Sequence, residues 1–260
     1  MSIGKSIRVT LVSTIGFAAL ALPGVAAPPT PIDLAGETVG AEPKAFVPVV
    51  GFWRIEDDNG KKVLVVDGRQ WKEGQSSAGI ADKARTLYGE RYAEFLDRVQ
   101  AYAYFPYVVA PDISNFTDGE ISVRFEGLSG RIDQGAGILF NLKPNGDYLT
   151  IRANCLENNL VLWKFENGKR SSVNWVRNTP TATHQWHDLK VRISGTKIQG
   201  RPAGVRTHRF VVKSRQPHVF LRLHGDGGEL RRCPTSSSKV LDAGKCCRLR
   251  TCVAQDLGAG

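Results

Sequence analysis

Hydrophobic and polar residues alternate strictly in one central segment, residues 148–155. A period of two is that of a β-strand with one buried and one exposed face. The two rows of this segment are Leu149, Ile151, Ala153 and Cys155 on one side, and Tyr148, Thr150, Arg152 and Asn154 on the other. The polar stretch 156–159 and the apolar run 160–165 predict a turn and a second, antiparallel strand. We expect the first row to build the core and the second row to form a candidate ligand surface.

Short segments of the same kind recur on both sides of this strand pair, separated by turn sequences. An Asp-Asp-Asn-Gly turn at 57–60 predicts a hairpin between two of them. The predicted strands are 52–55, 62–66, 101–109, 120–128, 135–142, 173–176, 186–193 and 197–200. Many short strands joined by tight turns are typical of an antiparallel sandwich. The pattern therefore predicts an all-β jelly-roll sandwich over about 49–200.

Residues 78–100 break the β pattern. Apolar residues recur there at spacings of three and four, namely at Ile80, Ala84, Leu87, Tyr88, Tyr92, Phe95, Leu96 and Val99. This spacing predicts one amphipathic helix, inserted between strands and packed on the sheet or at its end. We expect its aromatic side chains to belong to the core rather than to a cofactor site.

The chain begins with the pattern of a targeting segment. Lys5 and Arg8 precede an uncharged apolar run at 9–22, and small residues follow up to Ala26. The run is shorter than the roughly 20 residues of a membrane span. We therefore expect a cleavable signal peptide at 1–26, a periplasmic or secreted protein, and no transmembrane segment in the mature form. A short membrane anchor is the alternative. The Pro-rich segment 27–48 is predicted to be a linker without a core of its own.

The net charge of +10 is unevenly distributed along the chain. Residues 201–260 carry twelve basic and four acidic side chains, whereas residues 27–200 carry 21 of each. A nucleic-acid-binding domain concentrates positive charge on the folded face that docks. Because the predicted sandwich is neutral, we do not expect a nucleic-acid partner.

Three segments resemble strands of the laminin-G-like, concanavalin A-like jelly rolls. They are 133–140, 148–159 and 186–191, of which the last reads Trp-His-Asp-Leu-Lys-Val. The nearest resemblance is to bacterial exported proteins grouped with the 3-keto-disaccharide hydrolase domain. It implies a jelly-roll fold and, as one possible activity, glycoside hydrolysis of 3-keto-disaccharides or related sugars. The closing strands of that family, one with Gly-x-Trp and one rich in Phe and Asp, have no counterpart after residue 200.

The sequence shows no convincing pair of carboxyl groups for glycoside cleavage. A retaining glycosidase needs two carboxyl groups about 5 Å apart. Glu120 and Glu126 share a strand face, but six residues of strand place them about 20 Å apart. We interpret both as solvated, and His187, which lies on an apolar row, as a packed and hydrogen-bonded histidine. No catalytic residue is assigned, and neither a metal nor a cofactor is expected.

The best candidate site is the polar row of the central strand together with its neighbours. Amide groups and a guanidinium fork can satisfy the donors and acceptors of a sugar, and an indole ring can stack on its apolar face. The candidate ligand-binding residues are Asp133, Gln134, Arg152, Asn154, Glu157, Asn158 and Trp163. The sequence favours a non-catalytic module for a carbohydrate or another small polar ligand. The alternatives are a glycoside hydrolase, a structural envelope protein, and an ordinary wet sheet face with Trp163 in the core. The oligomeric state is not predicted.

Composition changes after about residue 200. All Trp and Tyr residues precede that point, whereas four of the five cysteines follow it, at Cys233, Cys246, Cys247 and Cys252. One hypothesis is a shift of reading frame, and the other is a genuine disulfide-bearing extension of unknown connectivity. The segment 206–223 is expected to supply two substitute strands, and 224–260 to be disordered. Cys155 is predicted to be a buried free thiol.

Overall fold

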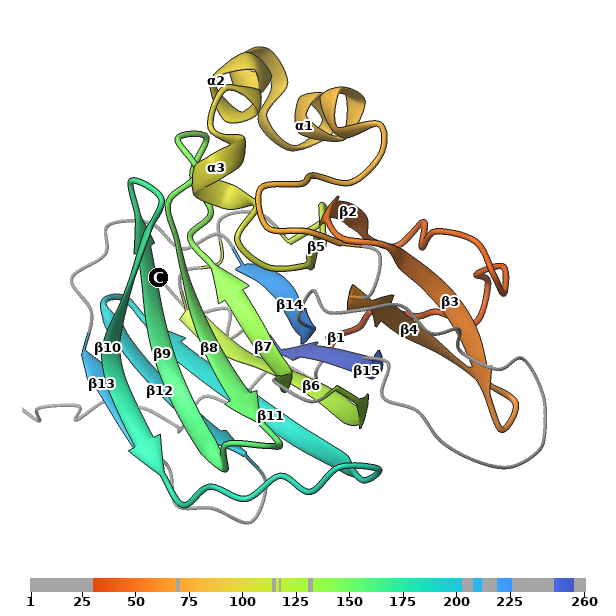
Figure 1. Cartoon of the computed structure of the whole chain (residues 1–260), viewed down its shortest axis with the longest axis vertical. Coiled ribbons are helices and arrows are strands. Elements are labelled where there is room, and N and C mark those ends of the chain that lie inside the picture. Colours follow the sequence, from red (N-terminus) through yellow and green to blue (C-terminus); the bar gives the residue numbers. More distant parts are fainter. Residues whose placement is uncertain are drawn as a thin grey trace, which may run out of the picture.

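The computed structural model describes residues 30–68, 71–113, 116, 118–130, 133–202, 208–211, 219–225 and 246–254. Within these residues the chain forms two antiparallel sheets that face each other, with three short helices at one end (Figure 1). The predicted all-β jelly-roll sandwich with a helical insertion is thus confirmed. The signal peptide predicted at 1–26, and with it the predicted export, lies outside the described residues. No helix in the described part of the chain is long and apolar enough to cross a membrane.

The first sheet has the strand order β13-β12-β11-β6-β15-β4-β3, and β1 pairs with β15. Its strands are β1 (Thr30–Pro31), β3 (Trp53–Asp58), β4 (Lys61–Asp67), β6 (Asp118–Ser129), β11 (Trp186–Ser194), β12 (Lys197–Pro202), β13 (His208–Val211) and β15 (Cys246–Ala254). The predicted hairpin joins β3 and β4, where Asn59 and Gly60 have the positive φ values of 54° and 79° that such a turn requires.

The second sheet has the strand order β10-β9-β8-β7-β14-β5-β2. Its strands are β2 (Val47–Val50), β5 (Tyr107–Val109), β7 (Gln134–Phe140), β8 (Tyr148–Asn154), β9 (Asn159–Glu166), β10 (Lys169–Arg177) and β14 (Val219–Gly225). Strand β10 is an edge of this sheet among the described residues.

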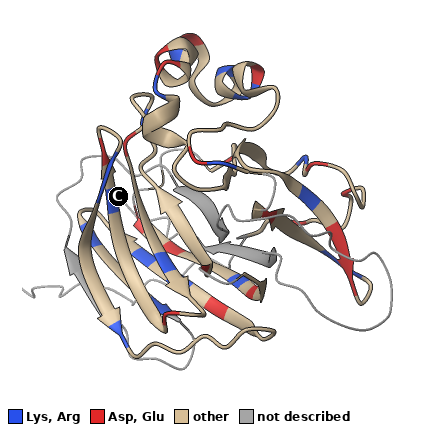
Figure 2. Ribbon diagram, in the orientation of Figure 1, with Lys and Arg blue, Asp and Glu red and all other residues tan. Residues whose placement is uncertain are grey.

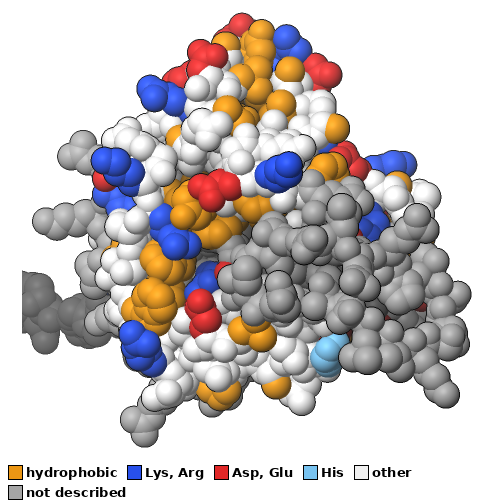
Figure 3. All heavy atoms as spheres, in the orientation of Figure 1, with side chains coloured by type: hydrophobic (Ala, Val, Ile, Leu, Met, Phe, Trp, Pro, Cys, Tyr) orange, Lys and Arg blue, Asp and Glu red, His pale blue; other side chains and the backbone are white. Residues whose placement is uncertain are grey.

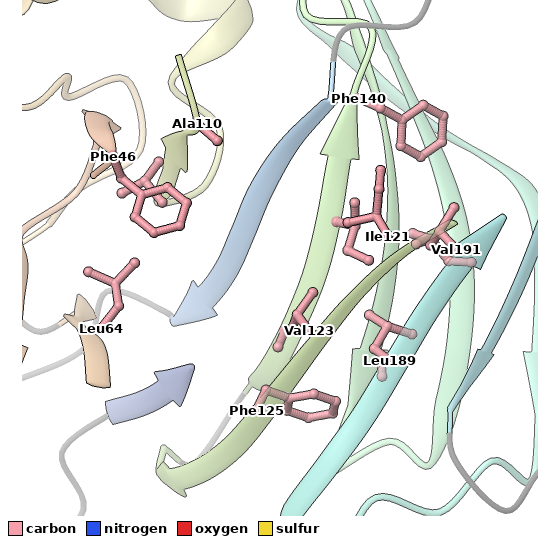
Figure 4. Packing of buried hydrophobic residues seen from close by; sticks show 14 of the residues in the cluster. Phe46, Leu64, Ala110, Ile121, Val123, Phe125, Phe140, Leu189 and Val191 are labelled. Carbon is pink, nitrogen blue, oxygen red and sulfur yellow. The ribbon is translucent and has the colours of Figure 1, made fainter. Parts of the chain in front are cut away.

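The core lies between the two sheets, and the period of two explains its composition. Strand β6 contributes Ile121, Val123 and Phe125, and the neighbouring β11 contributes Leu189 and Val191 (Figure 4). They pack with the inner row of the second sheet, which includes Ile138, Ile151, Ala153, Leu160 and Leu162. The cysteine at the end of that row, Cys155, is a buried free thiol as predicted, and burial raises its pKa.

The helical insertion is broken rather than continuous. It consists of α1 (Ile80–Tyr88), a 3-10 turn η2 (Gly89–Arg91), α2 (Tyr92–Leu96) and α3 (Val99–Tyr102). Gly89 has a φ of 54°, which an α-helix cannot contain, so the single helix predicted over 78–100 is wrong in its continuity. The strand predicted over 101–109 is also too long, because α3 extends to Tyr102, whose ring stacks 3.9 Å from that of Phe95.

The insertion also explains why the predicted burial of β8 was wrong. This strand was predicted to be half-buried, yet all seven of its residues are buried. Part of its outer row packs into a second hydrophobic cluster, where the ring of Tyr148 stacks on Phe165 at 4.2 Å. Other members of that cluster come from the insertion and the segment after it, including Phe95, Tyr102 and Phe105. Both faces of β8 are therefore covered.

The segments before and after the predicted sandwich also contribute to it. Leu34 and Phe46, from the predicted linker 27–48, belong to the inter-sheet core, and the Glu37 carboxylate accepts backbone hydrogen bonds from Lys44 and Ala45 at 2.7–2.9 Å. The linker is thus packed on the sandwich where it is described.

Three strands come from the segment that was predicted to be a tail. Strand β13 lies within the range 206–223 predicted for substitute strands, and β14 begins there and ends two residues beyond it. Strand β15 lies between β4 and β6 although residues 224–260 were expected to be disordered. Cys233 lies outside the described residues. The frameshift hypothesis stays a prediction, which translation of the other two reading frames beyond codon 200 would test.

Candidate ligand-binding face

The candidate site lies on the outer face of the second sheet, which is the face turned away from the first sheet. Arg152 on β8 is opposite Gly137 on β7 and Val161 on β9. A Cβ atom on Gly137 would lie 2.4 Å from the carbonyl oxygen of Ile151, and one on Gly135 would lie 3.3 Å from Cδ of Arg152. Because β7 carries glycine at both positions, it leaves room for the stem of the Arg152 side chain.

Arg152 is the centre of a hydrogen-bonded ion cluster. Its Nη1 donates to both carboxylate oxygens of Asp133 at 3.2 and 3.3 Å, and its Nη2 donates to Oε2 of Glu157 at 2.8 Å and Oδ1 of Asn159 at 3.0 Å. Asn159 Nδ2 donates to the same Glu157 oxygen at 2.8 Å, and Asn154 Nδ2 donates to Asp133. We call Asp133, Arg152, Asn154, Glu157 and Asn159 the Arg152 cluster. These bonds fix the orientation of every member.

Burial and charge vary across the Arg152 cluster. The side chain of Arg152 is only 5% exposed and that of Asp133 10%, whereas that of Glu157 is 42% exposed. The cluster holds two carboxylates and one guanidinium, so its formal charge is negative. Nε of Arg152 is buried and has no hydrogen-bond partner among the described residues. One edge of the guanidinium is therefore not satisfied by the described part of the protein.

Two tryptophan rings lie on the same sheet face, beside the Arg152 cluster. Trp163 on β9 and Trp175 on β10 pack edge to face with centroids 5.4 Å apart. Trp163 is 8% exposed, whereas Trp175, on the edge strand, is 40% exposed. Trp175 is opposite Val161, which is opposite Arg152, so about two strand spacings, or roughly 10 Å, separate Trp175 from the arginine.

The surface view shows how these parts combine. Figure 3 presents the outer face, with hydrophobic side chains on one side and, next to them, a hollow in which acidic and basic side chains meet. Arg170 lies over the ring of Trp163 at 4.6 Å, and Arg177 lies over the ring of Trp175 at 5.5 Å. An apolar platform, two exposed cations and a polar cluster thus share one face.

The structure brings four of the seven predicted site residues into one hydrogen-bonded group: Asp133, Arg152, Asn154 and Glu157. Trp163 lies beside the group on the same face. The other two do not join it through their side chains. Gln134 donates from Nε2 to the Gly130 carbonyl oxygen at 2.9 Å, and Asn158 is an exposed turn residue with a φ of 50°.

Asn159 and Trp175 also lie on this face and were not among the predicted site residues. Asn159 was assigned to the turn between the strands, although it is the first residue of β9. Trp175 lies just after a bulge in β10, between Ser172 and Asn174, which shifts the register and hence the face on which later side chains lie. Only the pairing of β10 with β9 reveals which way Trp175 points.

The residues weighed for catalysis lie elsewhere, on the first sheet. His187 Nε2 donates to the Ala182 carbonyl oxygen at 2.7 Å, as expected for a packed histidine. Glu120 forms an ion pair with Lys190 at 3.1 Å. Glu126, which lies opposite Trp186 of β11, was predicted to be solvated but is buried. Among the described residues, no group of three His, Cys, Asp or Glu side chains could hold a metal ion.

Comparison with known proteins gives only remote similarities. No protein-family model matches the chain, and no curated protein matches it. Among solved structures, the chain is similar to the carbohydrate-binding module CBM66 from Bacillus subtilis, with 14% identity, a TM-score of 0.38, and coverage of 84% of this chain and 96% of that one. It is also similar to a β-glucanase from Bacillus licheniformis, with 12% identity, a TM-score of 0.40, and coverage of 58% of this chain and 71% of that one. For a GH43 protein from the same organism the identity is 12%, the TM-score 0.44, and the coverage 78% of this chain and 34% of that one. The classification as a sandwich therefore rests on the strand order of this chain.

Proposed function

We propose that this protein binds a carbohydrate, or another small polar ligand, without cleaving it, on the outer face of β7, β8, β9 and β10. The observation that carries the proposal is the exposed ring of Trp175, which packs on Trp163 on the same sheet face as the Arg152 cluster. Sugars combine an apolar ring face with many hydroxyl groups. An indole platform next to fixed amide and carboxylate groups matches both properties.

The rigidity of the Arg152 cluster favours binding. Its side chains are held by one another and by the backbone, since Asn154 Oδ1 also accepts the N–H of Leu156 at 3.0 Å. Groups held in place before the ligand arrives lose little conformational entropy on binding. Glu157 and Trp175 are exposed on this face, so they would be among the first groups to contact a ligand.

Substitution of Trp175 tests the proposal. We expect Trp175→Ala to weaken the affinity for any retained glycan about two- to tenfold, because loss of one stacking contact costs about 0.5–1.5 kcal/mol. The control is Trp186→Ala, since Trp186 lies on the first sheet. A glycan array probed with wild type and both variants gives the measurement. Equal loss of signal in the two variants would contradict the assignment of this face, and a blank array would favour a structural protein without a ligand.

One observation favours glycoside hydrolysis as a second candidate. Asp133 and Glu157 both contact the guanidinium of Arg152, so two carboxylates lie on one face. In the structure, however, Arg152 and the two asparagines occupy oxygens of both carboxylates, and this arrangement favours recognition over attack. A panel of glycosides that includes 3-keto-disaccharides decides between the two functions. Turnover by the wild type that Glu157→Gln abolishes would establish a hydrolase instead of a binding module.

A further inference from the structure

Strand β10, at the edge of the candidate face, carries unusual charge. Its sequence from Lys169 to Arg177 contains three basic residues and no acidic one. Figure 2 shows basic residues at both ends of the strand. Arg170 and Arg177 are opposite Phe165 and Asn159 of β9, six residues apart, so the two backbone positions are about 20 Å from each other.

These two arginines are not engaged with acidic groups. Both are exposed, and neither forms an ion pair with a described residue. Their guanidinium groups lie over aromatic rings: Arg177 over Trp175, and Arg170 over Tyr104, Phe105 and Trp163. The nearest acidic residue along the chain, Glu166, forms an ion pair with Lys164 at 2.8 Å. Two positive charges on the outer row therefore remain without a described counterion.

The ring contacts give these arginines a defined orientation. A guanidinium stacked on an aromatic ring still presents its N–H groups at its edge, where they fit both oxygens of a planar carboxylate. The two cations lie on either side of the two tryptophans, so positive charge flanks the apolar surface along β10. The Arg152 cluster, about two strands away, has a negative formal charge and suits hydroxyl groups rather than a further carboxylate.

We propose that the ligand is an acidic polysaccharide whose negative groups are the carboxylates of uronic acid residues. The chain of sugars lies along β10, with a sugar ring on the exposed Trp175 and carboxylates on Arg170 and Arg177, while hydroxyl groups face the Arg152 cluster. This inference rests on the proposed function of the same face, because it names the class of glycan that the face selects. It also predicts that part of the affinity is electrostatic and declines as salt is added.

The test compares matched pairs of ligands by calorimetric titration of the whole protein. Each pair is a uronic acid oligosaccharide, from galacturonan, mannuronan or glucuronan, and its carboxyl-reduced neutral counterpart of the same length. We expect at least one uronic acid ligand to bind about tenfold more tightly than its neutral counterpart at low salt. The double variant Arg170→Gln/Arg177→Gln should reduce that ratio to about one.

The control variant is Arg85→Gln/Arg91→Gln, which removes the same charge from α1 and η2 and should leave the ratio unchanged. Equal binding of acidic and neutral ligands would overturn this inference while the proposed function stands. If none of these oligosaccharides binds, the inference is wrong, and the glycan array decides whether the proposed function stands. Polyglutamate or dextran sulfate that binds as tightly as the uronic acid ligand would show attraction to any polyanion, and would also overturn the inference.

Discussion

Arg152→Ala is expected to lower the free energy of unfolding by about 3–5 kcal/mol, which is the effect of removing one partner from a buried ion pair. The substitution leaves the carboxylate of Asp133 buried without its guanidinium partner, although Asn154 still donates a hydrogen bond to it. It also removes one hydrogen bond from Glu157 and one from Asn159. Asp133 accounts for most of the loss, since Glu157 is 42% exposed and can be solvated by water.

Urea unfolding followed by circular dichroism measures this loss. The matched control is Arg91→Ala, because Arg91 also pairs with a carboxylate, that of Glu94 at 2.7 Å, but on the exposed surface of the insertion. We expect the control to cost less than about 1 kcal/mol. If Arg152→Ala costs no more than the control, then the Arg152 cluster is not a buried electrostatic unit, and the rigidity invoked for ligand binding is lost as an argument.

Gly137→Ala is expected to destabilise the protein by about 1–3 kcal/mol through overpacking. Alanine usually stabilises a strand relative to glycine because it restricts the unfolded chain, so the predicted sign is opposite to the ordinary one. The reason is the added Cβ, which would lie 2.4 Å from the Ile151 carbonyl oxygen and 3.3 Å from Cα of Arg152. Both are backbone atoms of β8, so relief requires that β7 and β8 move apart.

The comparison for Gly137→Ala is Gly36→Ala. A Cβ on Gly36 would meet no heavy atom within 4 Å, so this substitution should leave stability unchanged or slightly raise it. Thermal and urea unfolding of both variants give the measurement. A neutral Gly137→Ala variant would show that β7 and β8 can separate at little cost, contrary to the close approach described here.

The strand pattern could be predicted from sequence because each signal is local. Alternation identified β6, β8 and β11, and the Asn-Gly pair at residues 59–60 identified the turn between β3 and β4. The broken helix was not predicted, since apolar spacing alone does not reveal that Gly89 has a positive φ. The burial of both faces of β8 was also missed, because the side chains that cover its outer row come from residues 95–107, more than forty positions away.

In the candidate site, too, some residues could be predicted from the local pattern and others could not. Arg152 and Asn154 were found because they are polar residues on one row of one strand, and Asp133 and Glu157 because they are near the ends of paired strands. The face on which Trp175 lies is set by a bulge in β10, and the position of β15 is set by its pairing with β4 and β6. Neither feature leaves a local signal in the sequence. Long-range pairing therefore accounts for most of what sequence reasoning could not predict.

The most direct test of ligand binding on this face is an NMR titration of the indole and arginine Nε–H signals. The protein has five tryptophans, of which Trp163 and Trp175 lie on the candidate face and Trp53 and Trp186 on the first sheet. With the neutral and uronic acid oligosaccharides as probes, we predict that the signals of Trp163, Trp175 and Arg152 shift together, while those of Trp53 and Trp186 stay in place. Shifts confined to Trp53 and Trp186, or no shift with any probe, would contradict binding on this face.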